Sequence, residues 1–169
     1  MTLSSKTRGG LLLAGRILLA GIFIAAGYFK LREPWLQFAV SLNGFRILPD
    51  AMLEPVAKTL PWVELALGLA ILSGVWLRWF ALLATLMLGT FFSVLVRSFA
   101  MGLQVDCGCF GSGEALGPKT LVRDGVMLAL AIAVTTGAFL SRARNARALR
   151  DAADEPVAAA SDTEHSRPA

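Results

Sequence analysis

Residues 79–96 read WFALLATLMLGTFFSVLV and contain no charged side chain. A helix of about 20 mostly apolar residues is long enough to cross the hydrocarbon core of a membrane. This stretch therefore predicts a membrane-spanning helix, with Arg78 immediately before it and Arg97 immediately after it.

Three other stretches have the same apolar character: residues 11–29, 61–77 and 121–140. The 169-residue chain is 56% hydrophobic and 17% charged, with a mean hydropathy of +0.63. Soluble domains reach only about 45–50% apolar residues even with glycine counted, and a domain of this size cannot bury such an excess. The composition excludes a water-soluble enzyme, a nucleic-acid-binding domain and a disordered chain, and it predicts a lipid bilayer around the protein.

Small residues recur at every fourth position in the four stretches, which places them on one face of each predicted helix. Helices in lipid associate where small residues allow close approach. The sequence therefore predicts an all-α integral membrane protein, a four-transmembrane-helix bundle. The small-residue series are Gly21 and Ala25; Ala66, Ala70 and Gly74; Ala81, Thr85, Gly89 and Ser93; and Gly125, Ala129, Ala133 and Gly137.

The remaining segments predict shorter elements and a tail. Pro34 precedes apolar residues at helical spacing, and residues 50–60 repeat that pattern. Both indicate short amphipathic helices at the membrane surface, in the first outer loop. The fourth helix is expected to extend to about Ala153 before a disordered end. The expected domains are a transmembrane domain over residues 1–140 and a cytoplasmic tail over residues 141–169.

The basic residues predict the orientation in the membrane. Four crossings place both termini on one side, and a dense arginine cluster directly follows the fourth stretch, as is typical of the cytoplasmic side. We therefore expect a multi-pass inner-membrane protein with cytoplasmic termini and periplasmic loops over residues 30–60 and 97–120. The cluster also accounts for the net charge of +4, so the charge does not indicate nucleic acid. Its members are Arg142, Arg144, Arg147 and Arg150.

The most distinctive chemical feature is DCGCFG at residues 106–111. Cys107 and Cys109 are the chain's only cysteines, and Gly108 between them permits a tight turn. A disulfide in so small a ring would be strained, easily reduced and of little value as a brace. We therefore expect Cys107 and Cys109 to be the catalytic pair of a thiol–disulfide exchange, in an oxidising compartment.

Three other interpretations of the cysteine pair stay open. The two residues could form a structural bridge, hold a soft metal such as Cu(I) through two thiolates, or be thiols without a function. No metal site is assigned, because the single histidine, His165, lies in the polar tail.

Four charged residues are expected at the outer mouth of the bundle, beneath the cysteine loop. Lys30 ends the first helix, Glu64 lies one turn into the second, and the pair Arg123 and Asp124 begins the fourth. These charges could tune the thiolate or hold the headgroup of a quinone. The ordinary alternative is a set of ion pairs that fixes the ends of the bundle. Near the opposite end, Arg16 is expected to extend its side chain to the lipid headgroups.

Several strings along the chain carry a family resemblance. They are GIFIAAGYFK at residues 21–30, Pro34, Phe38-Ala39, Leu48-Pro49, Leu60-Pro61-Trp62 with Glu64, Gly68 and Gly74, Gly102-Leu103, DCGCFG at 106–111, and Arg123-Asp124. Together they resemble the MauE/DoxX family of membrane proteins over roughly residues 15–135. The CGCFG string in a four-helix setting points to the MauE branch.

The resemblance implies a four-helix inner-membrane protein. MauE members are associated with maturation of the small, disulfide-rich subunit of methylamine dehydrogenase in the periplasm. Related bundles pass electrons between protein thiols and a quinone. Carried over by position, Cys107 and Cys109 would be the redox pair.

We therefore expect a redox-associated membrane protein that assists thiol–disulfide chemistry or maturation of a periplasmic partner protein. One cysteine pair cannot relay electrons between two internal dithiol sites, so a partner or a quinone must complete the circuit. No cofactor is certain, and a quinone is the candidate. The alternatives are a non-catalytic membrane subunit or assembly factor, and a Cu(I)-binding membrane protein.

Overall fold

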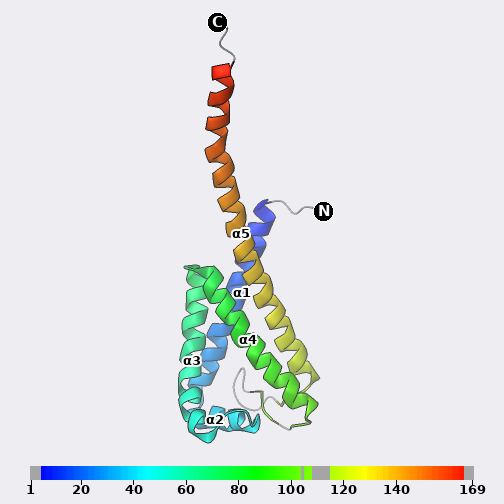
Figure 1. The fold of residues 1–169 in the computed structure, drawn as a ribbon. Coiled ribbons are helices and arrows are strands. Elements are labelled where there is room, and N and C mark those ends of the chain that lie inside the picture. Colours follow the sequence, from blue (N-terminus) through cyan, green and yellow to red (C-terminus); the bar gives the residue numbers. More distant parts are fainter. Residues whose placement is uncertain (1–4, 104, 108–114, 166–169) are drawn as a thin grey trace.

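The computed structural model describes residues 5–103, 105–107 and 115–165, and these form an all-helical protein (Figure 1). Within the described residues, four helices are long and apolar enough to cross a membrane, which confirms the predicted fold class. The remaining helix, α2, is short and lies across one end of the others (Figure 1). The helices are α1 (Ser5–Arg32), α2 (Trp35–Gly44), α3 (Asp50–Ser73), α4 (Leu77–Ala100) and α5 (Pro118–His165).

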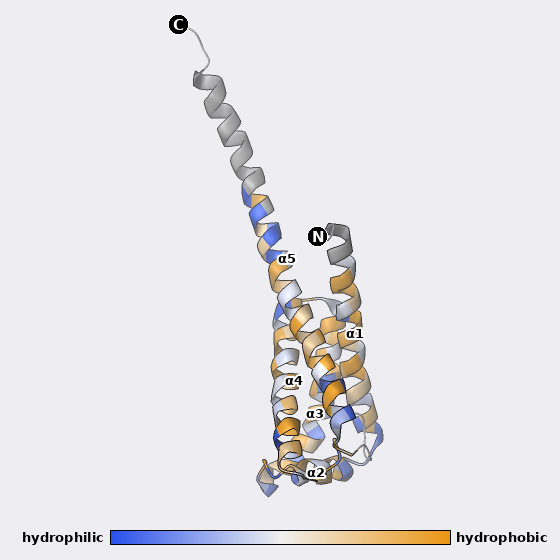
Figure 2. Cartoon of the chain, turned by 90° about the vertical axis from the view of Figure 1, so that its right-hand side faces the viewer, coloured by the Kyte–Doolittle hydropathy of each residue, from blue (hydrophilic) through white to orange (hydrophobic). Residues whose placement is uncertain are grey.

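The long helices associate mainly as two pairs, α1 with α3 and α4 with α5. Both chain termini lie at one end of the bundle, and α2 lies at the other (Figures 1 and 2). Exposed leucine, isoleucine and valine side chains, such as Leu18, Leu83 and Ile132, cover the outer surfaces of the spans. Figure 2 shows that hydrophobic residues predominate along the spans and that a hydrophilic stretch of α5 follows them. This distribution is the one expected of helices whose outer faces contact lipid.

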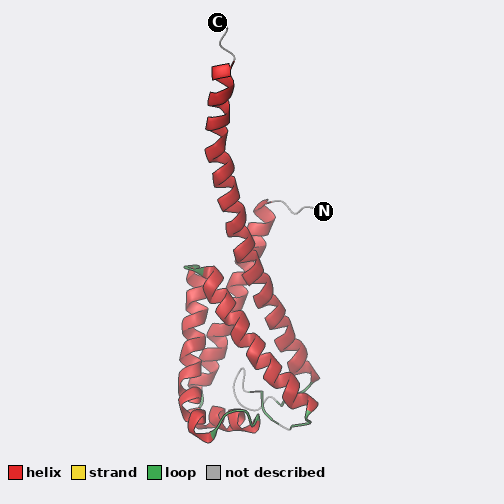
Figure 3. Cartoon of the chain, in the orientation of Figure 1, coloured by secondary structure: helices red, strands yellow, loops and turns green. Residues whose placement is uncertain are grey.

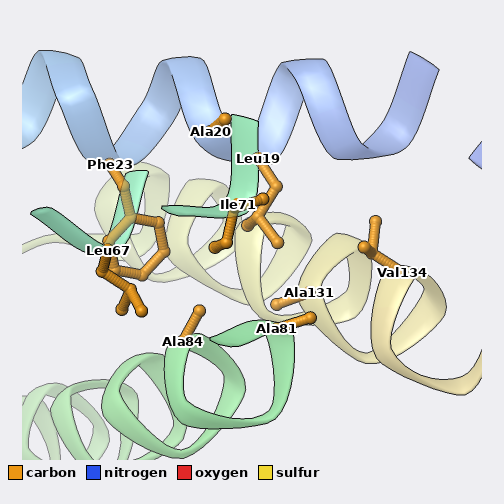
Figure 4. Packing of buried hydrophobic residues seen from close by; sticks show 9 residues of the cluster. All are labelled: Leu19, Ala20, Phe23, Leu67, Ile71, Ala81, Ala84, Ala131 and Val134. Carbon is orange, nitrogen blue, oxygen red and sulfur yellow. The ribbon is translucent and has the colours of Figure 1, made fainter. Parts of the chain in front are cut away.

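The two pairs join in a core of buried apolar side chains (Figure 4). Large side chains from α1 and α3 meet small ones from α4 and α5, so that the helices interdigitate. A hydrogen bond between Thr85 Oγ1 and Thr135 Oγ1, 2.9 Å long, also links α4 to α5. The core residues are Leu19, Ala20, Phe23, Leu67, Ile71, Ala81, Ala84, Ala131 and Val134.

The closest approach between helices is made by glycines outside the predicted small-residue series. A Cβ atom on Gly27 would lie 2.7 Å from the Pro61 carbonyl oxygen, and one on Gly68 would lie 3.0 Å from the Ala20 carbonyl oxygen. The two helices α1 and α3 can therefore touch at their backbones only because these positions lack a side chain. In contrast, five residues of the predicted series are exposed, namely Gly21, Ala66, Ser93, Ala129 and Ala133. The series therefore mark the packed faces only in part, since Gly125 and Gly137 of α5 do lie against Phe92 and Leu12.

The structure also corrects the predicted boundary inside α3. The surface helix expected over residues 50–60 and the span expected over residues 61–77 are one continuous helix, with Pro55 and Pro61 inside it. The first half of this helix is held by α2, through a cluster of apolar side chains, and this packing outweighs the cost of the prolines. The helix then ends at Ser73, before the predicted end. The cluster comprises Phe38, Ala39, Leu42 and Ala57.

Arg16 stabilises the end of α3. Its Nη2 atom donates a hydrogen bond of 2.9 Å to the Leu72 carbonyl oxygen, so the side chain contacts a neighbouring helix instead of extending to the lipid headgroups. The carboxyl end of a helix carries a partial negative charge and unpaired carbonyl groups, which favour a cation at this position. Gly74 follows with φ of +76°, a left-handed conformation that turns the chain toward α4.

Figure 3 shows that most of the described chain is helical and that the described loops lie between the helices. The last helix, α5, continues to His165, whereas the sequence expectation ended it near Ala153. Alanine is the strongest helix former, and it is frequent from residue 143 to residue 160. The division into a membrane domain to residue 140 and a cytoplasmic tail stays a prediction.

Candidate functional site

Backbone contacts hold together the two ends of the segment that carries the cysteines. Asp106 and Ala115 form an isolated antiparallel bridge, and the Leu116 amide donates a hydrogen bond of 2.8 Å to the Val105 carbonyl oxygen. The segment also packs against the last residue of α2, because a Cβ atom on Gly44 would lie 2.9 Å from Val105 Cγ1. These contacts fix the start of the cysteine segment against the α2 end of the bundle.

Cys107 lies at this pinned end and is fully buried. It shares an apolar cluster with Phe45 and Leu95, and so contacts both the turn after α2 and the last turns of α4. Cys109 lies outside the described residues. The structure therefore places one member of the predicted cysteine pair.

The buried sulfur is close to both charged residues of the Arg123-Asp124 pair. Cys107 Sγ donates a hydrogen bond to Asp124 Oδ2 at 3.6 Å, and Arg123 Nη2 donates one to Cys107 Sγ at 3.7 Å. Arg123 Nε also donates to Asp124 Oδ1 at 2.9 Å. The three side chains thus contact one another, with Asp124 buried and Arg123 partly exposed.

The other two predicted charges also form a pair. Lys30 Nζ lies 2.5 Å from Glu64 Oε1, and the two side chains are only 4% and 8% exposed. The ammonium group of Lys30 also lies 5.2 Å from the centre of the Phe38 ring, so α2 covers the pair. The second carboxylate oxygen, Glu64 Oε2, is buried and accepts no hydrogen bond within the described part of the chain.

A cavity of about 460 Å³ connects these charges. Lys30, Glu64 and Asp124 all line it, and most of the remaining lining is apolar. Asp124 therefore faces the cavity and contacts Cys107, and Arg123 joins the group through Asp124. The structure thus places the predicted outer-mouth residues in two groups, Lys30 with Glu64 and Arg123 with Asp124 and Cys107, and both groups border the same cavity.

Several residues at the cavity gave no signal in the sequence. Met87, Phe91 and Met127 line it, yet they occur within continuous apolar stretches where any face could point to lipid. The turn after α2 contributes Phe45 and Ile47. Only the packing of the two helix pairs against each other decides that these side chains face a common space.

The contacts of Cys107 suit thiol chemistry. The thiolate is the form of cysteine that attacks a disulfide, and a neighbouring guanidinium group stabilises its negative charge. A carboxylate oxygen within hydrogen-bond reach can accept the thiol proton. Arg123 and Asp124 occupy these two positions around the sulfur.

Comparisons with known proteins agree on one family. A family model described as methylamine utilisation protein MauE matches residues 8–137. A protein of Paracoccus denitrificans, named methylamine utilization protein MauE, is 36% identical over 125 residues. The alignment covers 72% of this chain and 67% of that protein. No solved structure matches the chain. With most of its length matched by the family model and by this relative, the chain belongs to the MauE family of methylamine utilisation proteins.

Proposed function

We propose that this membrane protein assists methylamine utilisation by thiol–disulfide exchange that matures a periplasmic partner. The observation that carries the proposal is the burial of Cys107 against Asp124 and Arg123, at 3.6 Å and 3.7 Å from its sulfur. A guanidinium group stabilises a neighbouring thiolate and a carboxylate can accept the thiol proton, so this pair suits a sulfur that gains and loses a proton. The candidate partner is the disulfide-rich small subunit of methylamine dehydrogenase.

The exchange transfers two electrons from the partner to this protein. A partner thiolate attacks the Cys107–Cys109 disulfide, which forms a mixed disulfide and releases one thiolate of the pair. A second partner thiolate attacks the mixed disulfide, so that the partner gains a disulfide and Cys107 and Cys109 become a dithiol. Two protons accompany the two electrons, and Asp124 is placed to carry the proton of Cys107.

The burial of Cys107 supports different tasks for the two cysteines. A sulfur that is fully buried cannot meet a thiol of another protein. In the proposed mechanism the partner therefore exchanges with Cys109, and Cys107 re-forms the internal disulfide. Reoxidation of the pair needs a two-electron acceptor, either a second thiol protein or a quinone.

The experiment is a trapping assay in cells that produce this protein together with the small subunit. Thiols are blocked in acid, and mixed disulfides are separated on non-reducing gels. The small subunit is produced as a variant that keeps one cysteine of a disulfide pair, so that no second partner thiolate can resolve the mixed disulfide. We then expect a covalent complex through Cys109 to accumulate. With Cys107→Ser or Cys109→Ser the internal disulfide is absent, so we expect no complex with this variant and little maturation of the natural subunit.

Asp106→Asn is the matched control, since it changes an exposed neighbour in the same pinned segment and should mature the subunit normally. Normal maturation by both serine variants would overturn the proposal in favour of a non-catalytic assembly factor. A complex joined to the partner through Cys107 and not through Cys109, as identified by mass spectrometry after digestion, would overturn the assignment of tasks.

A further inference from the structure

The cavity beneath the cysteine segment has a feature that thiol exchange does not use. It is a largely apolar space of about 460 Å³, within the range of about 300–1,000 Å³ typical of small-molecule sites. One of its walls carries Glu64, which is 94% buried as judged from its 6% exposure. The Oε2 atom of this residue accepts no hydrogen bond among the described residues. Buried carboxylate oxygens normally have a donor, so this one indicates a donor other than the described residues, such as a bound molecule.

The charges around the cavity restrict what that donor is. Two carboxylates, Glu64 and Asp124, and one ammonium group, Lys30, line it. An anionic headgroup would be repelled by the two carboxylates, and a cationic one would be placed beside the ammonium group of Lys30. Moving any charge into an apolar cavity also costs far more than moving a hydroxyl group that finds a hydrogen bond. The arrangement therefore favours an uncharged molecule.

The lining of the cavity indicates the chemistry of the remaining part of the bound molecule. The lining comes from helices that span the membrane, and its side chains include aromatic ones such as Phe23, Phe91 and Phe92. Such a surface favours alkyl chains and rings. At the edge of the cavity, Ile47 and Thr90 are exposed, so the cavity is open to the surroundings of the bundle.

We propose that this cavity binds an uncharged, lipid-soluble molecule whose hydroxyl group donates a hydrogen bond to Glu64. The hydroxyl belongs either to a ring, as in an alkylphenol, or to a chain, as in a lipid alcohol, and the experiment separates these two sources. The proposal concerns a ligand and does not depend on the thiol chemistry at Cys107.

The test uses the purified full-length protein in lipid nanodiscs and an octanol that carries a photoreactive diazirine. After illumination, the labelled residues are identified by mass spectrometry. We expect labelling at cavity residues such as Met87, Phe91 and Met127. Competition by 4-hexylphenol stronger than that by 1-octanol would identify a ring-borne hydroxyl, and the reverse order would identify a chain-borne one. Competition by octanoate as strong as by either would overturn the exclusion of anions.

A double variant removes the hydrogen-bonding partner and keeps the cavity. In Lys30→Met with Glu64→Leu, an apolar pair replaces the buried ion pair, a change that proteins often tolerate. We expect labelling by the octanol probe to weaken on the order of ten-fold, as the loss of a hydrogen bond to a charged group predicts. The matched control is Lys58→Met with Glu54→Leu, which removes an exposed ion pair from α3 and should leave labelling unchanged.

A second variant tests the space itself. Ala26 lines the cavity, and Ala26→Phe should fill part of it and reduce labelling. Gly21→Phe on the same helix is the control, because nothing lies within 4 Å of a Cβ atom there.

Two outcomes would overturn the proposal. The first is labelling by the octanol probe that is equal in the wild type and the double variant. The second is equal labelling by an octane that carries the same diazirine, which would mean that acyl chains simply fill the cavity. Both outcomes leave the trapping assay untouched, so failure of this proposal is distinct from failure of the proposed function.

Discussion

The turn between α3 and α4 depends on the absence of a side chain at position 74. Gly74 has φ of +76°, and a Cβ atom there would lie 2.5 Å from Nη1 of Arg16. An L-residue other than glycine in the left-handed region costs roughly 1–2 kcal/mol. We expect Gly74→Ala to lower the free energy of unfolding by about that amount, and more if Arg16 loses its bond to Leu72. Thermal unfolding in detergent measures the effect.

Gly21→Ala is the control for this substitution, because a Cβ atom at Gly21 meets nothing within 4 Å. It should unfold at the wild-type temperature or slightly above it, since alanine favours helix. Equal unfolding temperatures for the two variants would show that the left-handed turn does not matter for stability.

Removing only one partner of the buried ion pair between Lys30 and Glu64 should strongly lower the stability of the protein. Glu64→Leu leaves a buried ammonium group without its carboxylate, which typically costs about 3–5 kcal/mol. We expect this single variant to be strongly destabilised and the double variant with Lys30→Met to recover most of the loss. Glu54→Leu, in the exposed pair with Lys58, should cost about 0–1 kcal/mol.

Denaturation of the four proteins in the same detergent gives the comparison. A double variant that is as unstable as Glu64→Leu would show that stability comes from another contact of Glu64 and not from the charge pair.

At the scale of the helices, α1 and α3 are held together by a backbone contact. At Gly27, an added methyl group would meet the Pro61 carbonyl oxygen at 2.7 Å and the Leu65 amide nitrogen at 3.0 Å. Backbone atoms cannot rotate away as a side chain can, so the helices themselves must separate. We expect Gly27→Ala to destabilise the protein by about 1–3 kcal/mol, as overpacking does.

Gly89→Ala in α4 is the matched control, because its nearest neighbour would be a leucine methyl group at 3.9 Å. It should be neutral or slightly stabilising in the same unfolding assay. A loss at Gly89 equal to that at Gly27 would mean that α4 depends on close packing as much as α1 does.

The length of α3 shows why a sequence pattern is weakest at element boundaries. Pro61 separates a short amphipathic segment from an apolar one, and the natural prediction is two helices. In the structure α2 packs along the first segment and holds it in line with the second. The decisive cluster joins Phe38, Ala39 and Leu42 of α2 to Ala57 of α3, and no local pattern in the sequence reveals it.

At the scale of the whole molecule, the fold predicts that its two ends face opposite sides of the membrane. Both termini lie at one end and the cysteine segment at the other. We expect a cysteine at Met101, which is 58% exposed, to react with a membrane-impermeant maleimide in intact spheroplasts. A cysteine at Leu149, 73% exposed, should react only after lysis.

Both replacements are made in a protein whose natural cysteines are changed to serine, so that each label reports one position. The reverse pattern of labelling would place the cysteine segment in the cytoplasm. The orientation, and the periplasmic exchange proposed from it, would then both be wrong.

The sequence by itself determined the membrane-spanning helices, because about 20 apolar residues in a row have one stable arrangement in lipid. It also located Cys107, Glu64 and the Arg123-Asp124 pair, since charged and thiol groups stand out against apolar helices.

Only the tertiary structure decided how these residues meet. In lipid every outer face of a helix is apolar, so hydrophobic periodicity does not reveal which face is packed. The glycine contacts and the pairing of Lys30 with Glu64 follow from the way α1 packs against α3, and the cavity follows from the way that pair packs against α4 and α5. The packing of α1 on α3 depends on close contacts between residues distant in the sequence, such as Gly27 with Pro61.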